Sequence, residues 1–168
     1  MSRLNTKTLT TLALLTAIEI VLSRFLSVNA WNIKIGFNFI PIVVAAMIYG
    51  PVEAGIVAAL GDFIGTILFP IGAYFPGFTL TAFLTGCIFG LFLHKKQSWR
   101  HSIAAVGINQ FLFSLFLNTL WISILYCSPY GPLLLTRIFQ CLLLTAVQLP
   151  CIQVIAKTLN RYGKKVFY

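Results

Sequence analysis

The sequence contains few charged side chains and almost no acidic ones. Charged residues make up 9% of the 168 residues, and the acidic ones are Glu19, Glu53 and Asp62. A soluble domain carries roughly a quarter charged residues. Hydrophobic residues make up 59% of the chain. This composition excludes the soluble globular and disordered classes and predicts an integral membrane protein.

Several motifs that carry chemistry are also missing. The sequence has no G-x-x-x-x-G-K-[ST], no H-E-x-x-H and no G-x-S-x-G, and its three acidic residues are spread over two spans without forming a cluster. The four cysteines show no C-x-x-C or C-x-x-H spacing, so we interpret them as small buried hydrophobic residues. We therefore expect no catalytic residues, no metal and no cofactor. The chemistry favours binding and passage of a ligand.

Apolar runs predict six membrane-spanning helices in a single domain over residues 1–168. A spanning helix needs about 20 apolar residues. The predicted spans are 8–24, 36–50, 51–69, 77–93, 101–127 and 132–157. The second and third are short, and Gly50-Pro51 separates them, so we expect tilting or a re-entrant segment there. We expect the first to be a true span and not a cleaved signal, because Glu19 and Arg24 interrupt its hydrophobic core.

The basic residues predict the orientation of these spans. With six spans, nine of the twelve cations fall on one side: two before the first span, three around residues 95–100 and four after residue 156. The positive-inside rule then puts both termini in the cytoplasm, in a multi-pass protein of the cell membrane. The net charge of +9 is interpreted in this way and not as a nucleic-acid-binding surface. The loops near 25–35, 70–76 and 128–131 would face outside.

Three charged residues, Arg24, Asp62 and Arg137, lie inside or at the edge of apolar segments. A charge at the centre of a spanning helix costs about 2.5–3.5 kcal/mol on insertion scales, so such residues usually face a cavity, a partner or a ligand. Two cations and one anion indicate a pocket for a mostly anionic ligand. The alternative is that Asp62 pairs with one of the arginines.

Polar residues form a stripe on each of the last two predicted helices. Both stripes follow steps of four, four and three, which is one helical face; they are Gln110, Ser114, Asn118 and Trp121, and Arg137, Cys141, Thr145 and Gln148. Because unpaired polar groups are costly in lipid, we expect both stripes to turn inward and to face each other. Interhelical hydrogen bonding explains most of them. For Asn118, Trp121 and Arg137, near the outer end, we favour a ligand role.

A loop bent by proline and glycine, residues 69–79, carries aromatic residues at the outer end. An interfacial aromatic belt is the simpler explanation. Tyr74, Phe75 and Phe78 are also suited to stacking on a flat ring. With the loop at 25–35, which contains Trp31, this segment is expected to form a lid over a pocket. Asp62 is suited to accept paired N–H donors from a heterocycle.

Small residues at a spacing of four mark two helices. Ala13 and Ala17 on the first predicted helix form a small-xxx-small pair that lets another helix approach closely. The fourth helix has Ala82, Gly86 and Gly90 at the same spacing. Either pattern fits internal packing or a docking face for another subunit.

Together these features resemble the S components of energy-coupling factor (ECF) vitamin transporters, and more specifically the folate-specific members. The likeness covers the whole chain, and its most specific part is Tyr74-Phe75-Pro76-Gly77-Phe78-Thr79-Leu80-Thr81. Further matching segments are residues 22–27, 49–51, 61–62, 70–73 and 117–121.

The resemblance implies an all-α membrane subunit that binds folate in a lidded pocket near the extracellular side. Its implied partners are a transmembrane coupling protein and two cytoplasmic ATPases, with Ala13 and Ala17 at the coupling face. Folate is a dianion with a flat ring and a glutamate tail. We expect Arg24 and Arg137, with Lys34 as a further candidate, to hold carboxylates or ring oxygen. Asp62 or Asn118 would meet the ring edge, and the aromatic residues Tyr74, Phe75, Phe78 and Trp121 would stack on it.

Three alternatives remain open at this point. An S component for another vitamin is possible; thiamine is disfavoured by its positive charge, and riboflavin, which is nearly neutral, is less easily dismissed. A homo-oligomeric channel lined by the two polar stripes is the second. A membrane enzyme acting on lipid-linked phosphates is the third, but it needs clustered acidic ligands or a His–carboxylate pair.

Overall fold

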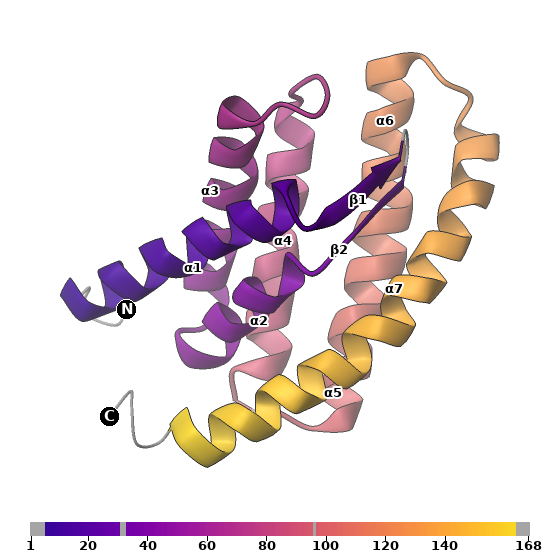
Figure 1. Cartoon of the computed structure of the whole chain (residues 1–168). Helices are drawn as coiled ribbons and strands as arrows, with labels where there is room; N and C mark the ends of the chain where they lie inside the picture. Colours follow the sequence, from indigo (N-terminus) through magenta and orange to yellow (C-terminus); the bar gives the residue numbers. More distant parts are fainter. Residues whose placement is uncertain (1–5, 31–32, 96, 164–168) are drawn as a thin grey trace.

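The computed structural model describes residues 6–30, 33–95 and 97–163 as a bundle of helices with one small hairpin (Figure 1). In chain order the elements are α1 (Thr6–Arg24), β1 (Ser27–Ala30), β2 (Ile33–Gly36), α2 (Phe39–Ile48), α3 (Pro51–Leu68), α4 (Pro76–Leu93), α5 (Trp99–Gly107), η1 (Ile108–Leu117), α6 (Asn118–Tyr126), α7 (Tyr130–Thr158) and η2 (Leu159–Gly163). The segments η1 and η2 are wide-turn π-helical stretches that continue α5 and α7.

Five helices in the described ranges are long and apolar enough to cross a membrane. They are Thr6–Arg24, Pro51–Leu68, Pro76–Leu93, Trp99–Tyr126 and Tyr130–Arg161. The prediction of a helical multi-pass membrane protein is thus confirmed. The second predicted span, 36–50, was too long: α2 has 10 residues, about 15 Å of helix, which is half the thickness of the hydrocarbon core.

The segment expected to be a loop at 25–35 contains an antiparallel hairpin. β1 pairs with β2 with Val28 opposite Ile35 and Ala30 opposite Ile33. Gly36, predicted as the start of the second helix, instead ends β2 opposite Ser27. In Figure 1 the hairpin lies across the space between α1 and the pair formed by α6 and α7. The correction matters because this hairpin, rather than an irregular loop, connects the end of α1 to α2.

Glycine and proline set the helix ends. Gly50 has φ of 114°, a backbone conformation that other residues rarely adopt, and Pro51 follows it as the first residue of α3. Phe75 is extended, as the residue before a proline prefers, and Pro76 starts α4. These two breaks fix the turn from α2 to α3 and the loop that leads into α4.

The core lies around α2, whose residues Val43, Ala45 and Ala46 are completely buried. Helices α3 and α4 pack closely through glycine. A Cβ added at Gly86 would lie 2.6 Å from the carbonyl carbon of Ala54, and one at Gly90 would lie 2.8 Å from that of Gly50. The Gly86 and Gly90 pattern is therefore internal packing. The outward faces are apolar, with Leu135 and Phe139 about 70% exposed, as expected for contact with lipid.

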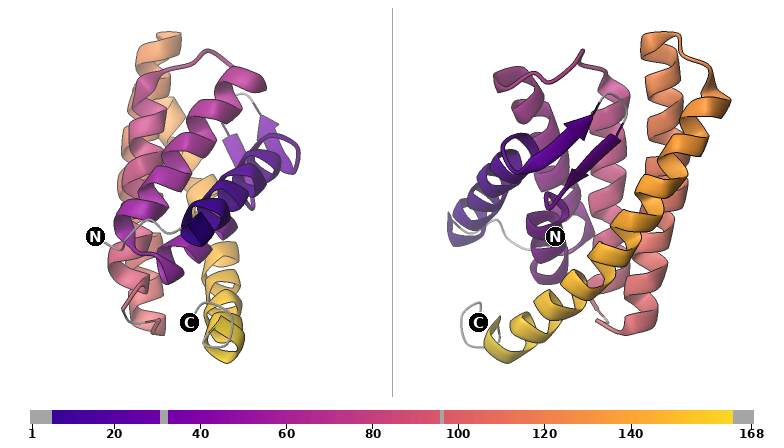
Figure 2. Two further views of the ribbon diagram at one scale, coloured as in Figure 1. Left: turned by 90° about the vertical axis from the view of Figure 1, so that its left-hand side faces the viewer. Right: turned by 45° about the vertical axis from the view of Figure 1, so that its right-hand side comes forward.

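Two of the loops that connect helices lie at the same end of the bundle. In both views of Figure 2 the α3–α4 loop and the α6–α7 loop are at the top, and the α4–α5 connection is at the bottom. This relative arrangement agrees with the six-span topology, in which residues 70–76 and 128–131 share a side.

Candidate functional site

A cavity of about 370 Å³, which we call the main cavity, lies between the upper halves of the helices. Its size is within the range of small-molecule sites, about 300–1,000 Å³. Helices α1, α2, α3, α4, α6 and α7 and the loop 69–75 contribute to its wall. The lining comprises Glu19, Ser23, Arg24, Asn38, Ile42, Ala58, Asp62, Thr66, Ile71, Gly72, Ala73, Tyr74, Phe75, Phe78, Thr81, Ala82, Thr85, Asn118, Ile122, Leu125, Tyr126 and Arg137.

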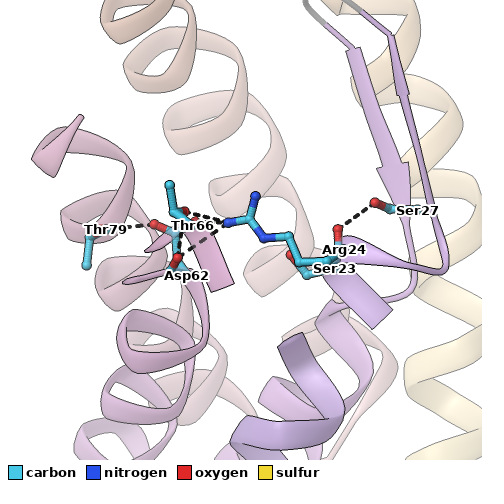
Figure 3. A network of polar contacts seen from close by, with 6 residues as sticks. All are labelled: Ser23, Arg24, Ser27, Asp62, Thr66 and Thr79. Carbon is cyan, nitrogen blue, oxygen red and sulfur yellow. Dashed lines mark hydrogen bonds and ion pairs between the residues drawn. The ribbon is translucent and has the colours of Figure 1, made fainter. Parts of the chain in front are cut away.

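Arg24 ends α1 and reaches across to α3, as Figure 3 shows. Its Nη2 donates to Thr66 Oγ1 and to the carbonyl oxygen of Asp62 at 3.4 Å, and lies 3.9 Å from Asp62 Oδ1. The guanidinium rests on Gly65, where a Cβ would lie 2.9 Å from Arg24 Nε. A larger residue at position 65 would displace the guanidinium from this wall of the cavity.

Asp62 is held from two sides. Oδ1 faces the Arg24 guanidinium, and Oδ2 accepts a hydrogen bond from Thr79 Oγ1 at 2.9 Å. The side chains of Arg24 and Asp62 are 8% and 23% exposed, so the pair is only partly screened by solvent. The sequence alternative in which Asp62 pairs with an arginine is therefore observed, and Arg24 is the partner.

Arg137 occupies the opposite wall, on α7. It is 5% exposed, and its Nη2 donates to the carbonyl oxygen of Ser114 at 3.3 Å. Over residues 6–30, 33–95 and 97–163 no carboxylate lies within ion-pairing distance of it, and its Nε makes no hydrogen bond. Arg137 is thus a buried cation, largely without counter-charge, that faces the cavity.

The two polar stripes face each other, as predicted. Cys141 Sγ lies 3.4 Å from the carbonyl oxygen of Gln110 and 3.9 Å from Ser114 Oγ. The stripe on the fifth span runs through η1, although the sequence predicted regular α-helix there. Wide turns of this kind often occur at functional sites.

Aromatic side chains close the upper part of the main cavity. The Phe75 ring lies 5.5 Å from Trp121 and 6.2 Å from Phe78, measured between ring centroids. Trp121 Nε1 donates to Thr81 Oγ1 at 3.0 Å, which fixes the indole. Tyr74 packs edge-on against Phe63. The loop 69–75 therefore presents flat apolar surfaces toward the hollow.

The structure gathers most of the predicted site residues. Arg24, Asp62, Tyr74, Phe75, Phe78, Asn118 and Arg137 all line the main cavity. Trp121 is not in its lining and stands behind Phe75. Trp31 and the side chain of Lys34 lie outside the described residues.

Sequence reasoning missed Glu19 as a cavity residue. Glu19 lines the main cavity and is 2% exposed. In the sequence, Glu19 serves only as an argument against a cleaved signal peptide. An acidic residue in the middle of a spanning helix was itself a signal of a site. With Glu19, the cavity wall carries two carboxylates and two guanidiniums.

A smaller cavity of about 180 Å³ adjoins the main one. Asn38, Ile42, Thr85, Asn118 and Arg137 line both. Three more amide side chains also line the smaller cavity: Asn109, Gln140 and Gln148. The polar wall of the site therefore extends along η1 and α7, below Arg137.

Comparison with known proteins adds independent information. A family described as "ECF-type riboflavin transporter, S component" matches residues 3–161. The folate transporter FolT of Clostridium novyi is 45% identical over 130 residues, which cover 77% of this chain and 76% of that protein. The folate transporter FolT of Leuconostoc mesenteroides is 35% identical, with 76% and 70% covered.

A solved structure is similar throughout. The crystal structure of FolT bound with folic acid superimposes with a TM-score of 0.87 at 35% identity, over 92% of this chain and 97% of that one. Members of this family are transport subunits and not enzymes. The chain therefore belongs to the S components of ECF-type vitamin transporters, and within them to the folate-transporter group.

Proposed function

We propose that this chain captures extracellular folate in the main cavity and delivers it through an ATP-driven ECF module. The observation that carries the proposal is a cavity of about 370 Å³ that joins two buried guanidiniums to a cluster of aromatic rings. Folate combines two carboxylates with flat rings, so it matches both parts of this wall. The folate transporters similar to this chain support the same ligand.

In this proposal, Arg24 and Arg137 hold carboxylates or ring oxygen. Asp62 or Asn118 meets the ring edge, and Tyr74, Phe75 and Phe78 stack on the aromatic system. Trp121 supports Phe75 from behind. Charge-assisted hydrogen bonds to arginine are among the stronger polar contacts, which suits a ligand captured at low concentration.

The chain would work as one domain, together with a transmembrane coupling protein and two cytoplasmic ATPases. Ala13 and Ala17 are exposed on α1, where a partner helix can approach closely. Both termini would lie in the cytoplasm, since the basic residues concentrate on that side.

The direct test is to purify the chain and identify what co-purifies by absorbance and mass. One equivalent of a pterin-containing compound supports the proposal. Reconstituted vesicles with and without the ATPases then test transport: uptake without ATPases would instead indicate a channel.

Riboflavin is the second candidate, because the matching family is described by that vitamin. Riboflavin lacks carboxylates and would make little use of Arg137. Competition for the purified chain separates the two candidates. We expect added folate to displace bound labelled folate, and riboflavin at the same concentration not to displace it.

A further inference from the structure

Three exposed cations lie at the end of the bundle away from the main cavity. Lys95 follows α4, Arg100 lies in the first turn of α5, and Lys157 lies near the end of α7. The α4–α5 connection and the end of α7 are both at the bottom of the views in Figure 2. Over residues 6–30, 33–95 and 97–163, none of these three side chains forms an ion pair or a hydrogen bond with a protein group. Their charge is therefore available to a partner outside the chain.

A hydrogen bond joins α5 to α7 close to this end. Gln153 Nε2 donates to Ser102 Oγ at 2.8 Å. Trp99 lies three residues before Ser102, and Lys157 lies four residues after Gln153. Residues three or four apart share a helix face, so Trp99 and Lys157 lie on the two faces that meet at this bond, one turn closer to the end of the bundle. We call this place, formed by Trp99, Ser102, Gln153 and Lys157, the α5–α7 junction.

The junction presents polar and apolar groups in the order in which a phospholipid presents its own. Trp99 is 51% exposed, and indole rings favour the level of the lipid headgroups. One turn deeper on the same faces, Ile103 follows Trp99 by four residues and Val154 precedes Lys157 by three. Ile103 and Val154 are 45% and 64% exposed. A headgroup beside Lys157 and Trp99 would therefore place its acyl chains along Ile103 and Val154.

We propose that the α5–α7 junction binds an anionic phospholipid, with Lys157 and Trp99 in contact with the headgroup. Arg100 and Lys95 lie at the same end of the bundle and add attraction without direct contact. The lipid is recognised by its negative headgroup together with its acyl chains. In the orientation proposed above, this end lies in the cytoplasmic leaflet, where anionic lipids concentrate. The proposal goes beyond the proposed function and does not depend on which ligand the main cavity binds.

The test uses phospholipids that are brominated on their acyl chains, because bromine quenches a tryptophan only at close contact. The purified chain is reconstituted in equimolar vesicles of phosphatidylglycerol and phosphatidylcholine, with one or the other lipid brominated. The Trp99 signal is the difference between the unmodified chain and Trp99→Phe. We expect Trp99 to prefer phosphatidylglycerol by about fivefold, the effect of one basic residue at a membrane surface. High salt should reduce this preference.

Substitutions at Lys157 separate this contact from general surface charge. Lys157→Gln should lower the preference to below about twofold, and Lys157→Arg, which keeps the charge, should retain it. Lys7→Gln is the matched control, because it removes one exposed cation from the start of α1. It should leave the preference of Trp99 unchanged. A single thermal transition in detergent verifies the fold of each variant.

Four results would overturn the proposal. The first is equal quenching of Trp99 by the two brominated lipids. The second is a preference that survives in Lys157→Gln, and the third is one that falls equally in Lys7→Gln, since it would then reflect the charge of the whole chain. The fourth is loss of the preference on adding glycerol phosphate, which would identify a site for a free phosphate group in place of a lipid.

Discussion

The Arg24 guanidinium at the end of α1 lies 3.9 Å from the Asp62 carboxylate on α3, and a hydrogen bond to Thr66 accompanies the pair (Figure 3). One ion pair therefore joins the first helix to the third in the wall of the cavity. It also leaves Arg137 as the cavity guanidinium that no described carboxylate offsets.

Arg24→Ala should lower both stability and folate affinity. Removing one partner of a buried pair leaves the other charge uncompensated, at a cost of about 3 kcal/mol for a well-buried pair and less here because Asp62 is 23% exposed. We expect a lower Tm in detergent and at least a tenfold loss of folate affinity. Arg24→Lys, which keeps the charge without the planar fork, should be intermediate. Full stability of Arg24→Ala would show that the pair does not join the helices.

Arg137→Leu should lower the affinity for folate without lowering the stability of the chain. The substitution removes a buried cation that makes one hydrogen bond, to Ser114. We expect an affinity loss of about 10- to 100-fold if Arg137 meets a folate carboxylate. Folate dimethyl ester, which lacks the free carboxylates, provides the control. It should bind the unmodified chain weakly, and Arg137→Leu should lower its affinity only slightly further. Near-normal folate affinity in Arg137→Leu would show that Arg137 does not hold a folate carboxylate.

Folate binding should quench the fluorescence of Trp121. The chain has three tryptophans, and the Trp121 indole lies 5.5 Å from Phe75, which lines the cavity. A bound aromatic ring near Phe75 would change the environment of this indole. The quenching should largely disappear in Trp121→Phe and persist in Trp99→Phe, which changes an exposed residue at the start of α5. The opposite result would place the ligand elsewhere.

Gly90→Ala should destabilise the bundle, and Gly107→Ala should not. A Cβ at Gly90 would press on the backbone of Gly50 and Pro51, so α3 and α4 would have to move apart. Overpacking of this kind costs about 1–3 kcal/mol. At Gly107 nothing lies within 4 Å, and alanine favours helix by up to about 1 kcal/mol. Thermal unfolding in detergent compares the two, and equal Tm values would contradict close contact between α3 and α4.

Bulky residues at Ala13 and Ala17 should block transport but not binding. Both alanines are exposed on α1, away from the cavity lining. In Ala13→Trp with Ala17→Trp, we expect normal folate binding by the purified chain and loss of ATP-dependent uptake by the assembled transporter. Leu135→Trp, on a lipid-facing position of α7 that is 70% exposed, is the matched control. Normal uptake in the double variant would exclude this face as the docking surface.

The helices could be predicted from hydropathy, and their ends from particular residues. Gly50 and Pro51 correctly separated α2 from α3, and Pro76 lies at the start of α4. The hairpin was missed because strands of four residues are held by pairing and by contact with neighbouring elements, which a short apolar run does not reveal. A short apolar strand and the start of an apolar helix look alike in sequence, and for this reason the second predicted span was too long.

The candidate site was predicted in part. Arg24, Asp62 and Arg137 were found because charge within lipid-type sequence is costly. Glu19 obeys the same rule, yet its place in the cavity wall depends on Gly61 leaving space on α3, and the two residues are 42 positions apart in the chain. No local pattern links them.

The sequence by itself determined that this chain crosses the membrane as helices and keeps charged residues among apolar ones. Both follow from the free energy of moving side chains from water to lipid, which depends on composition and order along the chain. The tertiary structure alone decided which charges meet. It set Arg24 against Asp62, left Arg137 on the opposite wall and placed Glu19 on Gly61, because these contacts depend on how helices distant in sequence pack side by side.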